Sequence, residues 1–71
     1  MIEIYSKPNC KFCVAAKALL NSKNIEFQEK TLDIDFSRDD IIAEFPLAKT
    51  FPVVVIDGKY IGGYEQLKTR I

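Results

Sequence analysis

Residues 2–20 read IEIYSKPNCKFCVAAKALL, in which an apolar alternation gives way to a polar loop and then to an alanine-rich segment. Ile2 and Ile4 alternate with polar neighbours, and this pattern predicts a first strand. Pro8 blocks an earlier helix start, while the apolar positions from Phe12 to Leu20 follow helical spacing. We therefore expect a strand, a loop and a helix that begins near the first cysteine.

The chain has two cysteines, Cys10 and Cys13, and both stand where this helix should begin. A thiol attacks as its thiolate, which the unpaired N–H groups and the positive end of a helix dipole stabilise. Lys7 and Lys11 add positive charge nearby. Three positions are about one helical turn, so the Cys13 sulfur can lie beside that of Cys10 and close or release a disulfide. A reactive dithiol is our first hypothesis, with Cys10 as nucleophile and Cys13 as resolving thiol.

Length and charge restrict the class of protein. With 71 residues, the chain can bury one modest core, and we expect a single domain over residues 1–71. Ten acidic and ten basic residues balance without a block of like charge, which argues against nucleic acid or an anionic membrane as the main partner. The start lacks signal-peptide features, and we expect a cytoplasmic protein. In a reducing compartment a lone C-x-x-C favours catalysis or metal binding over a permanent bridge.

The middle of the chain continues the alternation of strands and helices. Ile25 and Phe27 alternate as a second strand, which should lie parallel to the first in a strand–helix–strand unit. Ser37 is typical of an N-cap with an acid, Asp40, at the third helical position. A second helix should follow and end at Pro46.

The last third of the chain predicts two paired strands and a short helix. Residues 53–56 form a continuous β-branched run that is typical of a central strand covered on both faces. Asp57-Gly58 is a two-residue hairpin signal, so residues 59–61 should return antiparallel. Gly62-Gly63 should end that strand, and a last helix should bury Leu67. The predicted class is α/β, in the order β-α-β-α-β-β-α, with a four-stranded mixed sheet flanked by helices.

Three motifs in this order resemble those of a glutaredoxin, a family with the thioredoxin-like fold. They are the C-x-x-C that opens the first helix, Thr50-Phe51-Pro52 before the third strand, and Gly62-Gly63 before the last helix. The segment Ile4-Tyr5-Ser6-Lys7 is also similar to the one that leads to the active site in that family. The resemblance covers essentially the whole chain. It implies a thiol–disulfide oxidoreductase that reduces protein disulfides or glutathione mixed disulfides, with glutathione as co-substrate and no tightly bound cofactor.

The other two motifs suit an extended peptide such as glutathione. Pro52 favours an extended Phe51, whose backbone is then free to pair with a peptide. The glycine pair allows a sharp turn and close approach to a ligand. By resemblance, Lys7 would meet the glycyl carboxylate of glutathione, Phe51 its cysteinyl backbone, and the segment 63–65 its γ-glutamyl end; the proline would be cis. The candidate glutathione-binding residues are Lys7, Phe12, Thr50, Phe51, Pro52, Gly63, Tyr64 and Glu65.

The chain departs from the family pattern at two motif positions, and its loop before Thr50 and its tail beyond the last helix are also compact. Lys11 and Phe12 stand where many dithiol glutaredoxins have proline and tyrosine, and Glu65 and Gln66 stand where two aspartates are common. The resemblance implies a monomer whose partners are glutathione and disulfide-containing proteins, ribonucleotide reductase being a candidate. The electron source would be the glutathione reductase system or thioredoxin reductase. A glutaredoxin-like redoxin that takes electrons from thioredoxin reductase and serves ribonucleotide reductase is the alternative within the same chemistry.

Other classes of function remain open on the sequence. A zinc site needs four ligands as a rule, and the chain has no histidine and no third cysteine, so it would need carboxylates or a second subunit. An iron–sulfur cluster shared between two copies would use their first cysteines with glutathione. A non-catalytic interaction domain would keep ordinary thiols. Asp33 and Asp35 are interpreted as turn and capping residues and are assigned no catalytic or metal-binding role. Tyr5 and Phe27 are expected in the core.

Overall fold

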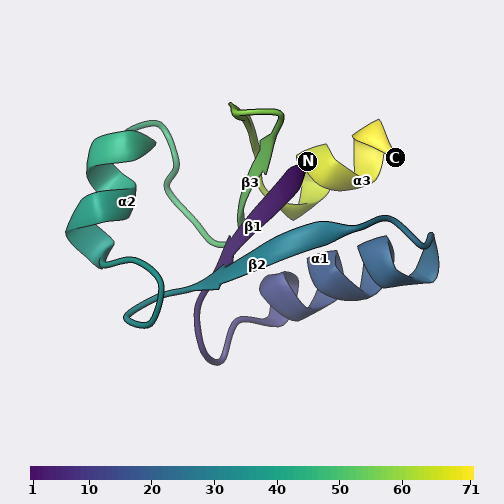
Figure 1. The fold of residues 1–71 in the computed structure, drawn as a ribbon, viewed down its shortest axis with the longest axis horizontal. Coiled ribbons are helices and arrows are strands. Elements are labelled where there is room, and N and C mark those ends of the chain that lie inside the picture. The colour runs from purple at the N-terminus through teal and green to yellow at the C-terminus, as the bar shows by residue number, and fades with distance from the viewer.

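The first half of the chain folds as a parallel strand–helix–strand unit. The computed structural model describes all 71 residues (Figure 1). Strand β1 (Ile2–Ser6) pairs in parallel with β2 (Phe27–Thr31), and helix α1 (Lys11–Ser22) connects them. The prediction is confirmed except that the second strand begins later: Ile25 lies before β2, and its N–H donates to the Leu20 carbonyl at the end of α1. That residue therefore closes the helix instead of joining the sheet.

The second half follows the predicted order. It comprises α2 (Arg38–Glu44), β3 (Val53–Ile56), β4 (Lys59–Gly62) and α3 (Tyr64–Arg70). Ser37 Oγ accepts the Asp40 N–H, and the Asp40 carboxylate accepts the Ser37 N–H, both at 3.1 Å. This is the capping box that the sequence predicted. Asp57 and Gly58 have φ of 50° and 81°, as a tight hairpin turn requires. Strand β4 includes Gly62, one residue more than predicted, because Gly62 pairs with Val54.

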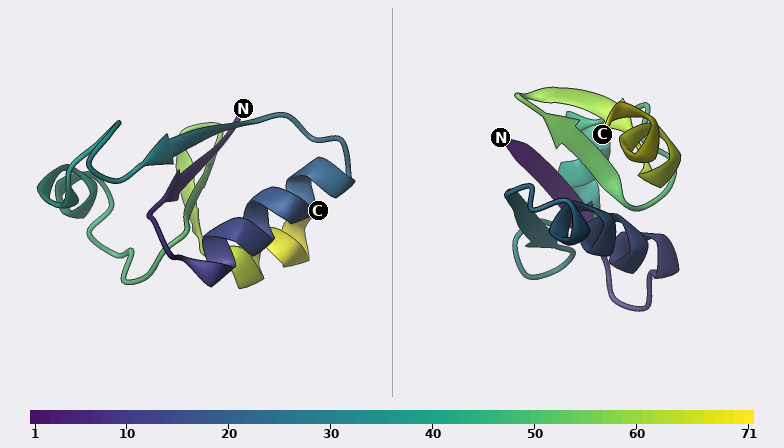
Figure 2. Two further views of the ribbon diagram at one scale, coloured as in Figure 1. Left: turned by 90° about the horizontal axis from the view of Figure 1, so that it is seen from below. Right: turned by 90° about the vertical axis from the view of Figure 1, so that its right-hand side faces the viewer.

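The sheet has the order β2-β1-β3-β4, with β3 antiparallel to both of its neighbours. Helices α1 and α3 lie side by side on one face, and α2 lies beyond one end of the sheet (Figure 2). As predicted, β3 is central, and its residues Val53 to Val55 are at most 2% exposed. No helix has the length and apolar character needed to cross a membrane.

Two apolar clusters hold the layers together, one on each face of the sheet, because successive side chains of a strand point to opposite faces. The α1/α3 face buries Ile4, Ala16, Leu20, Val54 and Leu67, all of them fully. The opposite face buries Tyr5, Ile41, Val53 and Val55, which attaches α2 to the sheet. The expected core position of Tyr5 is thus confirmed, whereas Phe27 is partly buried and packs against the first cluster.

This topology brings the three sequence motifs to one end of the sheet. Tyr5 pairs with Val53, so the end of β1 lies beside the start of β3. Val54 pairs with Gly62, so the end of β4 lies there too. The cysteines follow β1, Pro52 precedes β3 and the glycine pair follows β4. Strand pairing alone therefore assembles a common site from segments as far apart in the chain as Cys10 and Gly63.

Candidate active site

The two cysteines occupy different environments at the start of α1. Cys10 is the N-cap residue, partly exposed, and its Sγ accepts the N–H of Cys13 at 3.2 Å. Cys13 is 1% exposed and is joined to Cys10 by a disulfide. A hydrogen bond and the helix dipole both favour negative charge at the N-cap sulfur. The pair therefore supports thiol–disulfide exchange with one accessible sulfur and one buried sulfur.

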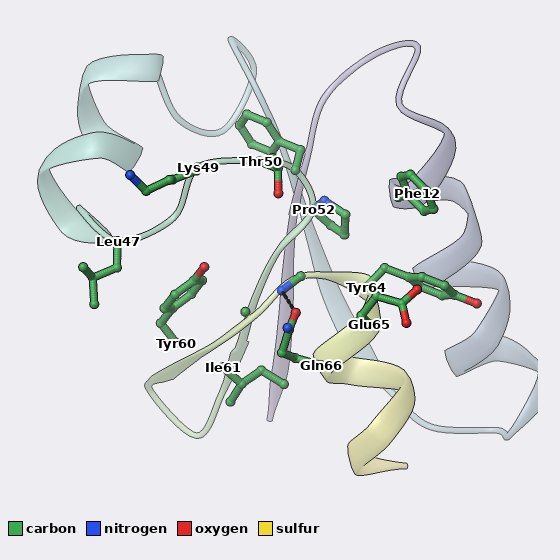
Figure 3. Close-up of a pocket in the computed structure, with 13 residues that line it drawn as sticks. Phe12, Leu47, Lys49, Thr50, Pro52, Tyr60, Ile61, Tyr64, Glu65 and Gln66 are labelled. Carbon is green, nitrogen blue, oxygen red and sulfur yellow. Dashed lines mark hydrogen bonds between the residues drawn. The ribbon is translucent and has the colours of Figure 1, made fainter.

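Beside the first turn of α1 lies a cavity of about 500 Å³, within the size range of small-molecule sites. We call it the groove. Seven predicted residues line it: Phe12, Thr50, Phe51, Pro52, Gly63, Tyr64 and Glu65. The Phe51–Pro52 peptide bond is cis, as the resemblance implied. Figure 3 shows Pro52 at the end of the α2–β3 loop, which also carries Lys49 and Thr50.

Aromatic side chains form one end of the groove. The rings of Phe12 and Tyr64 lie 5.9 Å apart between centroids and join the starts of α1 and α3. Phe12 is 53% exposed although it is a large apolar side chain. This half-exposed aromatic pair, whose Phe12 follows Cys10 by two positions in the chain, provides an apolar contact surface for a bound disulfide.

Lys7, the eighth predicted residue, lies outside the groove lining. It lines a second cavity together with both cysteines. Its ammonium nevertheless lies 5.6 Å from the centroid of the Phe51 ring, so its positive charge is close to one wall of the groove.

Sequence reasoning missed several residues of the groove. They are Leu47, Lys49, Tyr60, Ile61 and Gln66. Lys49 directly precedes Thr50 and Gln66 directly follows Glu65, so an extension of each motif by one residue would have found both. Tyr60 carried no such signal, because its place in the groove depends on the pairing of β4 with β3.

The structure explains why glycine is needed at the end of β4, which the sequence alone did not show. Gly62 has φ of +127°, which disfavours any side chain, and a Cβ there would come within 2.6 Å of the Gln66 Cγ. Gln66 occupies that space because its Oε1 accepts the Gly63 N–H at 2.9 Å (Figure 3). The glycine at position 62 therefore leaves room for the Gln66 side chain that caps α3. The capped start of α3 in turn forms part of the groove wall.

A charged cluster borders the second cavity. Glu29 Oε2 accepts hydrogen bonds from Lys17 Nζ at 2.5 Å and from Ser6 Oγ at 3.0 Å. The Lys17 hydrogen bond is the main cause that lowers the pKa of Glu29 below its ordinary value of 4.5, against a smaller opposing effect of desolvation. Ser6 is the one fully buried polar side chain of the protein. We refer to Ser6, Lys17 and Glu29 as the Glu29 cluster.

The lowered pKa of Glu29 predicts a pH-dependent contribution to stability. A group whose pKa is lower in the folded than in the unfolded chain stabilises the fold above the unfolded value, and this contribution disappears as the pH falls through the folded value. The free energy of unfolding of wild type should therefore exceed that of Glu29→Gln most near neutral pH and approach it below about pH 4. Urea unfolding at both pH values measures the difference. An equal difference at both would contradict the prediction.

The predicted turn residues keep their structural role. The Asp35 carboxylate accepts the Thr31 N–H at 2.8 Å, and Asp33 adopts the positive φ of a turn. The structure contains no group of three or more His, Cys, Asp or Glu side chains arranged to hold a metal ion.

Comparison with known proteins agrees with this geometry. The family model of glutaredoxin matches residues 2–61. Glutaredoxin 3 of Escherichia coli (strain K12) is 38% identical over 66 residues, which cover 93% of this chain and 80% of that protein. The thioredoxin-like protein BC3987 is 29% identical with a TM-score of 0.78, and both chains are covered completely. The buckwheat glutaredoxin–glutathione complex is 29% identical with a TM-score of 0.82, covering 97% of this chain and 66% of that one.

The predicted thioredoxin-like fold is therefore confirmed, and the Cys10–Cys13 pair together with the family match supports thiol–disulfide oxidoreductase chemistry. The chain belongs to the glutaredoxin family of thiol–disulfide oxidoreductases.

Proposed function

We propose that this protein reduces glutathione mixed disulfides and protein disulfides, with Cys10 as the nucleophile and Cys13 as the resolving thiol. The proposal rests on the different exposure and hydrogen bonding of the two cysteine sulfurs. Cys10 is partly exposed and receives the Cys13 N–H, while Cys13 is almost fully buried. A bulky disulfide can therefore approach Cys10 only, and Cys10 has the environment that favours a thiolate.

The reaction proceeds by two exchanges. The Cys10 thiolate attacks the glutathione sulfur of a mixed disulfide; a new bond joins Cys10 to glutathione, and the target protein leaves as a thiolate that takes a proton from water. A second glutathione thiolate then attacks that glutathione sulfur, which releases oxidised glutathione and restores the Cys10 thiolate. With a protein disulfide, Cys13 instead attacks Cys10, and the Cys10–Cys13 disulfide forms as the reduced target departs.

The groove is the proposed glutathione site. Lys49 and Glu65 lie toward its opposite ends in Figure 3, so its walls differ in charge. Glutathione carries a carboxylate at its glycyl end and both an ammonium and a carboxylate at its γ-glutamyl end. We place the glycyl carboxylate near Lys7 and Lys49, and the γ-glutamyl end near Glu65.

The remaining predicted residues complete this site. Phe51 would pair through its backbone with the cysteinyl unit, as an extended peptide allows. Phe12 and Tyr64 would cover its apolar atoms. Gly63 has its N–H engaged by Gln66, so the γ-glutamyl carboxylate would rely on other donors at the start of α3, or displace the Gln66 side chain.

Disulfide-containing proteins in the cytoplasm, with ribonucleotide reductase as a candidate, are the proposed targets of the monomeric protein. Glutathione kept reduced by glutathione reductase is the proposed electron source. The Glu65 carboxylate is also 3.5 Å from the ammonium of Lys68, which competes with a ligand ammonium. A weakened glutathione site would favour the alternative electron source, thioredoxin reductase. The experiment must therefore distinguish the two electron sources.

The decisive experiment follows the reduction of a small glutathione mixed disulfide by purified protein under two regeneration systems. Turnover with glutathione and glutathione reductase is expected, and it should weaken when Lys49→Gln and Glu65→Gln are combined. Lys23→Gln combined with Glu44→Gln makes the same pair of charge changes at exposed positions outside the groove. Turnover with thioredoxin reductase alone would reject the glutathione site and retain the dithiol chemistry.

A further inference from the structure

The Glu29 cluster and the two cysteines share the second cavity of the molecule, which has a volume of about 670 Å³. Cys13 and Ser6 are 1% and 2% exposed, so a buried thiol and a buried hydroxyl both belong to the lining of this cavity. The side chain of Lys17 is 28% exposed, which is low for a lysine. The chemistry proposed for Cys10 uses none of these polar groups.

Lys17 follows Cys13 by four positions on α1. Side chains four apart on a helix lie on the same face, with their Cβ atoms about 5–6 Å apart. The hydrogen bond to Glu29 holds the Lys17 ammonium at this cavity instead of in open solvent. The Lys17 side chain therefore starts one helical turn from Cys13, and its positive charge is held at the cavity that the buried thiol lines.

Burial makes a fixed charge important for Cys13. A thiolate in a poorly solvated position is disfavoured unless a positive charge lies near it. The other charged side chains that line the cavity are Lys7 and Lys11, and none comes from α3. Lys7 lies toward Phe51, and Lys11 is only two positions from Cys13, a spacing that points the two side chains to different sides of the helix.

We propose that Lys17 is a positioning residue that stabilises the thiolate of Cys13, and that Glu29 limits this effect by holding and partly neutralising the Lys17 ammonium. The proposal rests on the assignment of Cys13 as the resolving thiol. It extends the functional site to a second face of the dithiol, away from the groove.

The step concerned is the resolution of the mixed disulfide on Cys10. The Cys13 thiol first gives its proton to water in the cavity. The resulting thiolate attacks the Cys10 sulfur, a bond forms between the two cysteines, and the bond from Cys10 to the target sulfur breaks. The target leaves as a thiolate that takes a proton from solvent. Lys17 carries no proton in this step and acts through its charge.

The test measures the pKa of Cys13 by thiolate absorbance in the Cys10→Ser variant, where Cys13 is the one remaining thiol. Adding Lys17→Gln should raise that pKa and lower the thiolate fraction at neutral pH about tenfold. Adding Glu29→Gln should lower the pKa, because an amide still accepts the Lys17 hydrogen bond but no longer offsets its charge. Lys17→Arg should leave the pKa close to that of the parent.

These opposite signs separate a charge effect from a packing effect, since both substitutions break the same ion pair and a merely structural role would shift the pKa in one direction. Lys23→Gln, at the end of α1, makes the same charge change far from Cys13 and should leave the pKa unchanged. Shifts of equal sign, or no shift in either variant, would overturn the proposal. If Lys17→Gln does not fold, an unchanged or raised pKa in the Glu29→Gln variant alone would overturn it.

A rate measurement gives the second readout. In protein that carries glutathione on Cys10, the release of glutathione reports the attack of Cys13, and Lys17→Gln should slow it about tenfold at neutral pH. An unchanged rate would overturn the role of Lys17. The pKa measurement needs no turnover, so a failure of the proposed glutathione chemistry and a failure of this inference give different results.

Discussion

Cys10→Ser is expected to abolish the reduction of both glutathione mixed disulfides and protein disulfides, a loss of at least about a thousandfold. Serine keeps the size of the side chain and can still accept the Cys13 N–H, so the start of α1 should remain intact. Its hydroxyl is not ionised at neutral pH and does not exchange with disulfides. Turnover of a glutathione mixed disulfide, coupled to glutathione reductase, measures the loss.

Cys13→Ser is the matched variant and should behave differently. Because a second glutathione can resolve the intermediate on Cys10, this variant should keep turnover of glutathione mixed disulfides and lose most reduction of protein disulfides. Circular dichroism of both variants controls for folding. Equal losses in the two variants on a glutathione mixed disulfide would contradict the division of roles between the two sulfurs.

The parts of the fold that could be predicted from the sequence are those determined locally. Asp57-Gly58 predicted the hairpin because a two-residue turn needs positive φ at both positions, and Ser37 with Asp40 predicted a helix start because their side chains bond each other's backbone. The second strand was predicted two residues early at Ile25. As an edge strand, β2 is defined by backbone pairing with β1, which side-chain alternation does not report.

The same distinction applies to the site. The cysteines, Pro52 and the glycine pair could be predicted because each combines a rare residue type with a fixed place at an element boundary. Lys17 and Glu29 could not, since their hydrogen bond depends on how α1 packs over β2, twelve residues further along the chain. Local patterns thus located the reactive atoms, and tertiary packing determined the charges around them.

Leu67→Ala is expected to cost about 2–5 kcal/mol of the free energy of unfolding, the usual range for a buried leucine truncated to alanine. Leu67 is fully buried and is the one buried residue of α3, where it packs in the cluster that contains Ile4 and Leu20. A seven-residue helix has little stability by itself, so α3 depends on this contact. Urea unfolding of the reduced protein measures the effect, and Arg70→Ala, an exposed change on the same helix, should stay within about 0.5 kcal/mol.

Loss of this contact should also loosen the groove wall, because α3 carries the groove residues Tyr64 and Glu65. In a chain of this size the total free energy of unfolding is expected near the lower end of about 5–15 kcal/mol, so the substitution removes a large share of it. Glutathione-dependent turnover should therefore weaken at temperatures where circular dichroism still reports a folded majority. A cost below about 1 kcal/mol would mean that α3 is held by its ends and not by its core contact. The wall of the groove would then be independent of the apolar layer beneath it.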